Sequence, residues 1–207
     1  VGTLLARAFV RDGHEVVVLS RQSAKEPLPW RVVVWDGRSV GEWQEELDGA
    51  DAVINLAGRS VNCRYHDRNR RAIKESRLAS TRALGEAITA CANPPAVWLQ
   101  SSTATIYCHR YDADNDEATG VLGGAEPNVP DTWRFSIDVA KSWESAARQF
   151  TLPKTRLVLM RSAMVMSPDA GGVFDTLLRL VRFRLGGRHG NGKQYVSWSH
   201  EHDFVQA

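Results

Sequence analysis

Short apolar segments rich in Val, Ile and Leu alternate with helical patterns along this chain of 207 residues. Continuous apolar runs predict strands that are buried on both faces, and they occupy residues 15–20, 30–35, 52–56, 97–101 and 156–160. Apolar side chains at helical spacing predict helices between them, at residues 3–12, 40–47, 67–92 and 135–150. The alternation indicates βαβ units, so the sequence predicts an α/β fold with a Rossmann-like, doubly wound parallel sheet.

The composition argues against several other classes of protein. Lys and Arg number 26 against 24 Asp and Glu, and this near-neutral balance argues against a dedicated nucleic-acid-binding protein. The Arg-rich stretch 64–82 also carries acidic residues, which favours a solvated helix face. No run approaches the roughly 18 apolar residues of a membrane span, and no signal peptide precedes the first strand. The 3 cysteines lack metal-ligand spacing, which favours reduced thiols, a cytoplasmic protein and no metal site.

The first two predicted strands and their neighbours suggest a dinucleotide site. Gly2 lies directly ahead of the first helix, where a glycine lets backbone amides approach a pyrophosphate. Ser20 and Arg21 follow the strand that ends beside the adenosine ribose in such folds. A carboxylate there would accept hydrogen bonds from the ribose, whereas Arg accommodates a 2′-phosphate. We therefore expect NADP (NADPH) to be favoured over NAD, the alternative being a solvated Arg21 after a strand.

A series of short motifs in a fixed order resembles the atypical and extended short-chain dehydrogenase/reductase superfamily. These motifs are Val1-Gly2, Leu19-Ser20-Arg21, Trp35-Asp36-Gly37, Ile54-Asn55-Leu56-Ala57-Gly58 and Ser101-Ser102-Thr103-Ala104-Thr105-Ile106-Tyr107. An uncharacterised epimerase/dehydratase-like branch, the "epimerase family" proteins, is similar in further motifs. These are Ser76-Arg77, Trp143-Glu144, Phe183-Arg184-Leu185-Gly186-Gly187 and Ser197-Trp198-Ser199-His200. The resemblance covers essentially the whole chain and implies an NAD(P)-binding oxidoreductase or epimerase.

The resemblance assigns roles to individual residues. On the cofactor it implies Gly2 at the phosphates, Ser20 and Arg21 at the 2′-phosphate, Asp36 at the adenine edge, Asn55, Leu56, Ala57 and Gly58 along the adenosine side, and Ser102 at the nicotinamide side. It implies Thr103 as the catalytic Ser/Thr and Lys141 as a second catalytic residue that also holds the nicotinamide ribose. On the substrate side we expect Arg77, Tyr107 and His200.

One position departs from the superfamily pattern. A Tyr normally precedes the Lys by four residues and moves a proton during hydride transfer, but Ile137 occupies that position here. The similar branch itself lacks the usual catalytic set. Two hypotheses follow: an NADP-binding oxidoreductase- or epimerase-like protein that acts on a small molecule such as a sugar nucleotide or carbonyl compound, or a non-catalytic NADP-binding regulatory or scaffold protein. Tyr107 is expected to pack as an aromatic wall, and the proton source stays unassigned.

The resemblance also divides the chain into two regions. Residues 1–162 are expected to form the NAD(P)-binding Rossmann-like domain, and residues 163–207 the beginning of a substrate-binding lobe. Helical patterns run up to both chain ends, and the usual first strand is missing. We therefore expect a chain truncated at both ends. No nucleic acid or membrane partner is expected, and a homodimer is left open.

Overall fold

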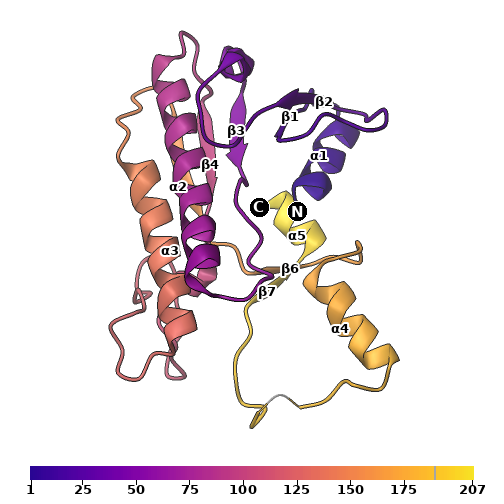
Figure 1. Cartoon of the computed structure of the whole chain (residues 1–207), viewed down its shortest axis with the longest axis vertical. Coiled ribbons are helices and arrows are strands. Elements are labelled where there is room, and N and C mark those ends of the chain that lie inside the picture. The colour runs from indigo at the N-terminus through magenta and orange to yellow at the C-terminus, as the bar shows by residue number, and fades with distance from the viewer. Residues whose placement is uncertain (189) are drawn as a thin grey trace.

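The computed structural model describes residues 1–188 and 190–207 (Figure 1). Its helices are α1 (Gly2–Arg11), α2 (Asp67–Ala90), α3 (Asp131–Arg148), α4 (Val173–Arg182) and α5 (Glu201–Gln206), with short 3₁₀ helices η1 (Glu42–Leu47) and η2 (Ala104–Ile106). Its strands are β1 (Val17–Ser20), β2 (Arg31–Val34), β3 (Ala52–Asn55), β4 (Val97–Ser101), β5 (Arg156–Met160), β6 (Met164–Met166) and β7 (Trp198–His200).

All strand pairs of the described sheets are parallel. β1 pairs with β2, and β4 lies between β3 and β5 in a second sheet. The five strands predicted from apolar runs are confirmed: β4 and β5 have the predicted bounds, and β1, β2 and β3 are shorter. The predicted burial on both faces is wrong for β1, which is half-buried, and for β2, whose first and last residues are exposed. The first sheet is not hydrogen-bonded to the second, so the predicted parallel sheet is interrupted between β1 and β3. The fold class is nevertheless α/β with Rossmann-like parallel strands, as the sequence predicts.

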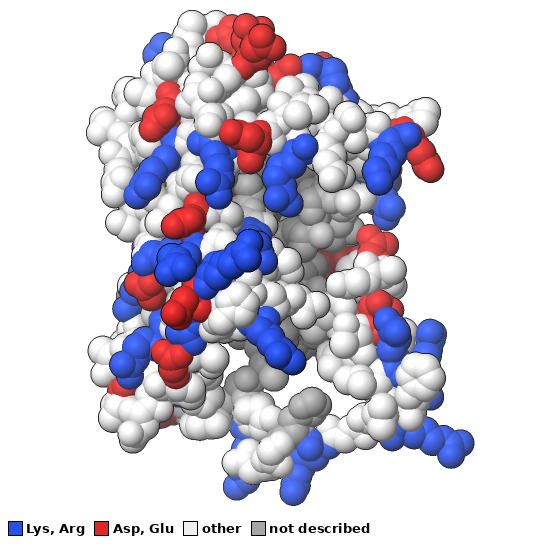
Figure 2. Space-filling view, in the orientation of Figure 1, with Lys and Arg blue, Asp and Glu red and all other residues white. Residues whose placement is uncertain are grey.

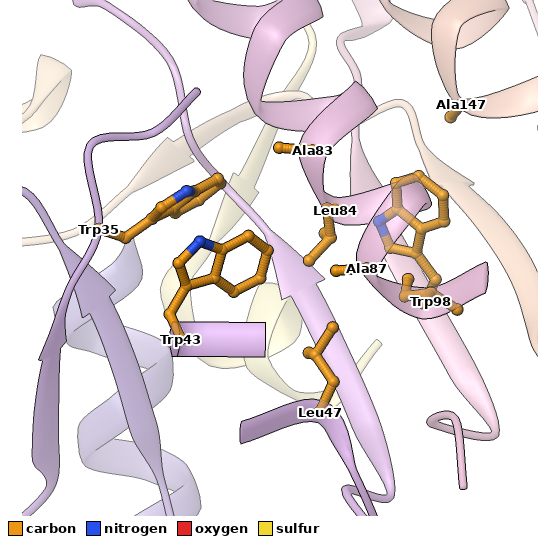
Figure 3. Close-up of a cluster of buried hydrophobic side chains, with 9 residues drawn as sticks. Trp35, Trp43, Leu47, Ala83, Leu84, Ala87, Trp98 and Ala147 are labelled. Carbon is orange, nitrogen blue, oxygen red and sulfur yellow. The ribbon is translucent and has the colours of Figure 1, made fainter. Parts of the chain in front are cut away.

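Helices α2 and α3 lie side by side along the sheet of β3, β4 and β5 (Figure 1). The main hydrophobic core gathers small and aliphatic residues of α2, Ala147 of α3 and the fully buried Trp98 of β4 (0% exposed). Trp35 and Trp43 lie next to each other on the other side of Leu84 and Ala87 (Figure 3), with their ring centroids 4.7 Å apart. The small residues on α2 allow this close packing, because a larger side chain there would hold helix and sheet apart.

Three predictions about local structure were wrong in detail. The helix expected at 40–47 is the 3₁₀ helix η1, which is flanked by Gly41 and Asp48. The side chains of Trp43 and Leu47 in this helix are buried. Helix α3 begins at Asp131 rather than 135, because Pro130 precedes it and the Asp131 carboxylate suits a helix N-terminus. The strands β6 and β7 were missed. Each has only three residues, and its partner lies far along the chain, so neither has a local signal.

The residues after 163 form β6, α4, β7 and α5. Helix α5 lies beside α1, close to both chain ends (Figure 1). Arg7 of α1 also forms an ion pair with Asp169, with 3.3 Å between Nη1 and Oδ2. Within residues 1–188 and 190–207, no helix has the length and apolar character needed to cross a membrane.

Candidate functional site

The predicted site residues follow the carboxyl ends of the parallel strands. Arg21 comes after β1, residues 56–58 come after β3, and Ser102 and Thr103 come after β4. A side chain placed on Gly2 would lie 3.7 Å from Leu56 Cδ1, so the start of α1 faces the end of β3. The fold therefore joins the first helix to the second sheet at the edge where open α/β folds bind ligands.

The start of α1 is suited to an anion. Gly2 is its first residue, is exposed, and is followed by no acidic residue in the first turn. Arg21 is also exposed, and no carboxylate of the described residues lies within 4.0 Å of its guanidinium. Ser20 Oγ accepts a hydrogen bond from the Gln22 N–H at 3.3 Å. Free amides at a helix N-terminus and an unpaired guanidinium both favour negative charge.

The Asp36 carboxylate accepts hydrogen bonds within the turn that follows it. Its Oδ1 accepts hydrogen bonds from the backbone N–H groups of Ser39 and Arg38, at 2.8 Å and 2.7 Å. These two bonds hold the pKa of the Asp36 carboxyl below its usual value. Asp36 also lines an open groove of about 600 Å³ beside β2, together with Glu42, Glu45 and Glu46. The carboxylates of this groove oppose phosphate binding there.

Asn55 is buried and connects three elements. Its Nδ2 donates to Gln100 Oε1 at 2.9 Å and to Thr81 Oγ1 at 3.3 Å. Its Oδ1 accepts from the Ala57 N–H at 3.0 Å. The Asn55 side chain thus ties the end of β3 to β4 and α2, and sets the path of the half-buried Leu56 and Ala57. Gln100 and Thr81 were not identified from the sequence, where nothing marked them.

Ser102 belongs to a buried charge network. Its Oγ donates to Glu144 Oε1 at 2.6 Å, and Glu144 is 4% exposed. Arg161 forms two hydrogen bonds to the same carboxylate, at 2.8 Å and 2.9 Å, and a third from Nη1 to the Tyr107 hydroxyl oxygen at 2.8 Å. Burial raises the pKa of Glu144, but the hydrogen bonds from Arg161 and Ser102 outweigh it and leave that pKa lowered.

The partners in this network were missed as functional residues. Glu144 was noted only within a resemblance motif, and Arg161 not at all. A Glu among apolar helix residues is the one signal that could have marked it, since a buried carboxylate requires a partner. The hydrogen bond from Arg161 holds the Tyr107 ring, which is buried, so Tyr107 packs inside the fold.

Thr103 and Lys141 are held by backbone groups. Thr103 Oγ1 accepts from the Thr105 N–H at 3.2 Å and caps η2. Lys141 Nζ donates to the Gly123 carbonyl oxygen at 2.5 Å. One turn before Lys141, Ile137 is only 2% exposed, and its Cδ1 lies 2.9 Å from where a Gly123 side chain would begin. The position of the usual Tyr is therefore a buried apolar contact with the loop 120–124.

The three residues expected on the substrate side each make separate contacts in the described part of the chain. Arg77 packs over the Trp143 ring, with 5.0 Å from Cζ to the ring centroid. His200 is exposed, and its Nδ1 accepts from the His202 N–H at the start of α5. In the part of the chain that the structure describes, no hydrogen bond or ring contact joins Arg77, Tyr107 and His200. No group of three or more His, Cys, Asp and Glu among those residues could hold a metal ion.

The basic residues of α2 are partly used in ion pairs with α3. Arg70 contacts Asp131, and Lys74 Nζ lies 2.7 Å from Asp138 Oδ2. On the α2 and α3 side of the face in Figure 2, Lys and Arg alternate with Asp and Glu. Such alternation is typical of a solvated surface rather than a continuous phosphate-binding stripe.

Comparison with known proteins gives a consistent family assignment. The model of the NAD dependent epimerase/dehydratase family matches residues 1–129. An epimerase family protein of Staphylococcus saprophyticus is 31% identical over 207 residues, which cover 100% of this chain and 65% of that protein. The human epimerase family protein SDR39U1 is 32% identical over 210 residues, covering 99% of this chain and 64% of the relative. The chain thus spans slightly less than two thirds of these relatives' length.

Solved structures agree with this assignment. The crystal structure of human SDR39U1 (isoform 2) with NADPH superimposes with a TM-score of 0.80 at 30% identity, over 99% of this chain and 63% of that one. A nucleoside-diphosphate sugar epimerase from Corynebacterium glutamicum gives a TM-score of 0.74 at 27% identity, over 99% of this chain and 39% of that one.

Proposed function

Because the chain belongs to the NAD-dependent epimerase/dehydratase family, we propose that it binds NADPH at the carboxyl ends of its parallel strands and acts on a small molecule. The observation that carries this proposal is the likeness, over nearly the whole chain, to a human protein solved with NADPH. The substrate class that the family favours is a sugar nucleotide or a related carbonyl compound. We also propose that residues 1–162 belong to the cofactor-binding domain and residues 163–207 to a substrate-binding lobe.

The residues present fit such a cofactor. The N-terminus of α1 carries no acidic residue in its first turn, and Gly2 is exposed and places no side chain there, which suits a phosphate group. Arg21 supplies a guanidinium with no carboxylate partner within 4.0 Å among the described residues, which suits the 2′-phosphate that distinguishes NADP from NAD. This supports the preference for NADP over NAD.

The reactive end would lie beyond β4. A bound nicotinamide cofactor supplies or accepts hydride there. Thr103 would orient the substrate carbonyl through its hydroxyl, and Lys141 would hold the nicotinamide ribose. Ser102 would keep its hydrogen bond to Glu144, which fixes the end of β4, and would not transfer a proton. Ile137 carries no proton, so the acid or base must come from another residue or from water.

A second candidate function is a non-catalytic NADPH-binding protein with a regulatory or scaffold role. The observation that favours it is the burial of Ile137 at the usual Tyr position, under the loop 120–124. A protein of this kind would keep the cofactor side of the site and lose turnover. A cytoplasmic location and a homodimer are further expectations, which fractionation and the mass of the protein in solution would test.

Two measurements test these proposals in sequence. Titration of the purified full-length protein with NADPH and NADH should give tighter binding of NADPH, and absence of binding to either would reject the proposed function. A panel of sugar nucleotides and carbonyl compounds is then tested for oxidation of NADPH by its absorbance. Turnover with any of them favours the enzyme, whereas tight NADPH binding without turnover across the panel favours the regulatory function.

A further inference from the structure

The loop that follows β3, residues 57–60, is held by two consecutive residues of α2. The Arg59 N–H donates to Ser76 Oγ at 2.9 Å. Arg77 Nη1 donates to the Arg59 carbonyl oxygen at 3.1 Å. Both polar groups of one loop residue's backbone are therefore bound by neighbouring side chains of the same helix.

Both of these side chains are themselves anchored to α2. Ser76 Oγ donates to the Ile73 carbonyl oxygen at 3.0 Å, so its lone pairs are left to accept from Arg59. Arg77 Nη1 donates to the same carbonyl at 3.0 Å. This shared anchor fixes the two side chains relative to each other.

The planar guanidinium of Arg77 also contacts the Trp143 ring and lies close to Gly58. The guanidinium stacks over the Trp143 ring at 5.0 Å, and a side chain on Gly58 would begin 3.1 Å from Cζ. Burial lowers the pKa of the Arg77 guanidinium, and among the described residues no carboxylate lies within 4.0 Å of it. Arg77 is half-buried, and a partly desolvated cation without a counter-ion is destabilising, so its contacts with the loop and the ring compensate.

The same contact explains the glycine at position 58. Any larger residue would push the guanidinium away by a few tenths of an ångström or displace the loop. Gly58 therefore allows close approach of Arg77.

We propose that Ser76 and Arg77 are positioning residues that clamp the backbone of Arg59 and so hold the loop 57–60 in the conformation that lines the cofactor. The role proposed here for Arg77 replaces the direct substrate contact expected from the sequence. The inference rests on the proposed function in one respect only, namely that the molecule lined by the loop 57–60 is the cofactor. The clamp itself depends on contacts within the chain.

Tryptic cleavage after Arg59 measures the clamp without any ligand. The cut after Arg64, which lies outside the clamp, is the internal reference, and both are quantified by mass spectrometry under native conditions. Three variants are compared with the parent protein: Arg77→Met, Ser76→Ala and the control Arg82→Met, which removes an exposed Arg from the same helix. NADPH affinity and the urea midpoint are measured for each.

We expect Arg77→Met to speed the cut after Arg59 about tenfold relative to the cut after Arg64, and to weaken NADPH binding by about the same factor, as for one lost charge-assisted hydrogen bond. Ser76→Ala should produce a smaller change in the same direction, and Arg82→Met none. If Arg77→Met fails to fold, the cleavage rate of Ser76→Ala tests the clamp instead. That variant removes only the hydroxyl group that accepts the Arg59 N–H, so we expect it to fold. Arg77→Lys should restore part of both properties through a hydrogen bond to the Arg59 carbonyl.

Each other outcome has a distinct meaning. Unchanged cleavage in both Arg77→Met and Ser76→Ala overturns the clamp. Faster cleavage with unchanged NADPH affinity overturns the link between the clamp and the cofactor. Weaker NADPH binding with unchanged cleavage would indicate a direct contact of Arg77 with the cofactor and also overturn the proposal. If the parent protein binds no NADPH, the proposed function fails, and the cleavage rates alone decide the clamp.

Discussion

Arg161 and Glu144 form a bidentate ion pair, with 2.8 Å between Nε and Oε1 and 2.9 Å between Nη2 and Oε2. The pair joins the residue after β5 to the C-terminal half of α3, and it holds Ser102 on one side and Tyr107 on the other. Two residues expected at the site from sequence thus depend on one buried carboxylate for their positions.

The first prediction concerns the stability that this pair confers. Glu144→Gln keeps the shape of the side chain but leaves the Arg161 charge partly buried and unpaired. We expect it to lower the free energy of unfolding by about 3 kcal/mol, the size expected when one member of a buried pair is removed. Urea unfolding measures this. Asp138→Asn, which breaks the exposed pair with Lys74, is the control and should cost less than about 1 kcal/mol.

The second prediction is the pH dependence of that stability. The pKa of Glu144 is lower in the folded protein than its ordinary value of 4.5. A group of this kind stabilises the fold above its unfolded pKa, and the contribution is lost as pH falls through the folded value. The difference in unfolding free energy between the parent protein and Glu144→Gln should therefore shrink progressively as pH falls below 4.5. A constant difference over that range would contradict the assignment.

The third prediction concerns cofactor choice. Arg21→Glu places a carboxylate where the 2′-phosphate of NADP is expected, so it should weaken NADPH binding by about tenfold or more. NADH lacks that phosphate, and its affinity should stay the same or rise. Fluorescence titration with both cofactors measures the ratio. Arg82→Glu on α2 makes the same charge change away from the strand ends and should leave the ratio unaltered.

The fourth prediction concerns the position of the usual Tyr. Ile137 is buried against Gly123 and Gly124, so Ile137→Tyr must displace the loop 120–124. We expect a loss of stability of about 1–3 kcal/mol from overpacking. Ile137→Val should cost about 0.5–1.5 kcal/mol as the matched small change. NADPH binding should survive in Ile137→Tyr where it folds. Gain of turnover at unchanged stability would show that the position is open to the site.

The order and type of the main elements could be predicted from the sequence alone. Each of the five strands from β1 to β5 lies in a largely apolar run, and such runs indicate strands without reference to the rest of the chain. How far each strand is buried depends on its neighbours, and β2 has exposed residues at both ends. The helices α1 and α2 carry their own apolar periodicity. Three-residue strands such as β6 and β7 have no comparable pattern, because their stability comes from pairing with a distant segment.

The candidate site divides in the same way. The sequence by itself determined that Gly2, Arg21, Ser102 and Thr103 follow strand ends or begin a helix, because parallel strands bring such positions to one edge. Only the tertiary structure decided what the side chains do there. Asn55 donates a hydrogen bond to Gln100, Ser102 donates one to Glu144, and Arg77 donates one to the backbone carbonyl of Arg59. These partners lie 18 to 45 residues apart, and their pairing follows from the need to satisfy polar groups that folding removes from water, which no local pattern encodes.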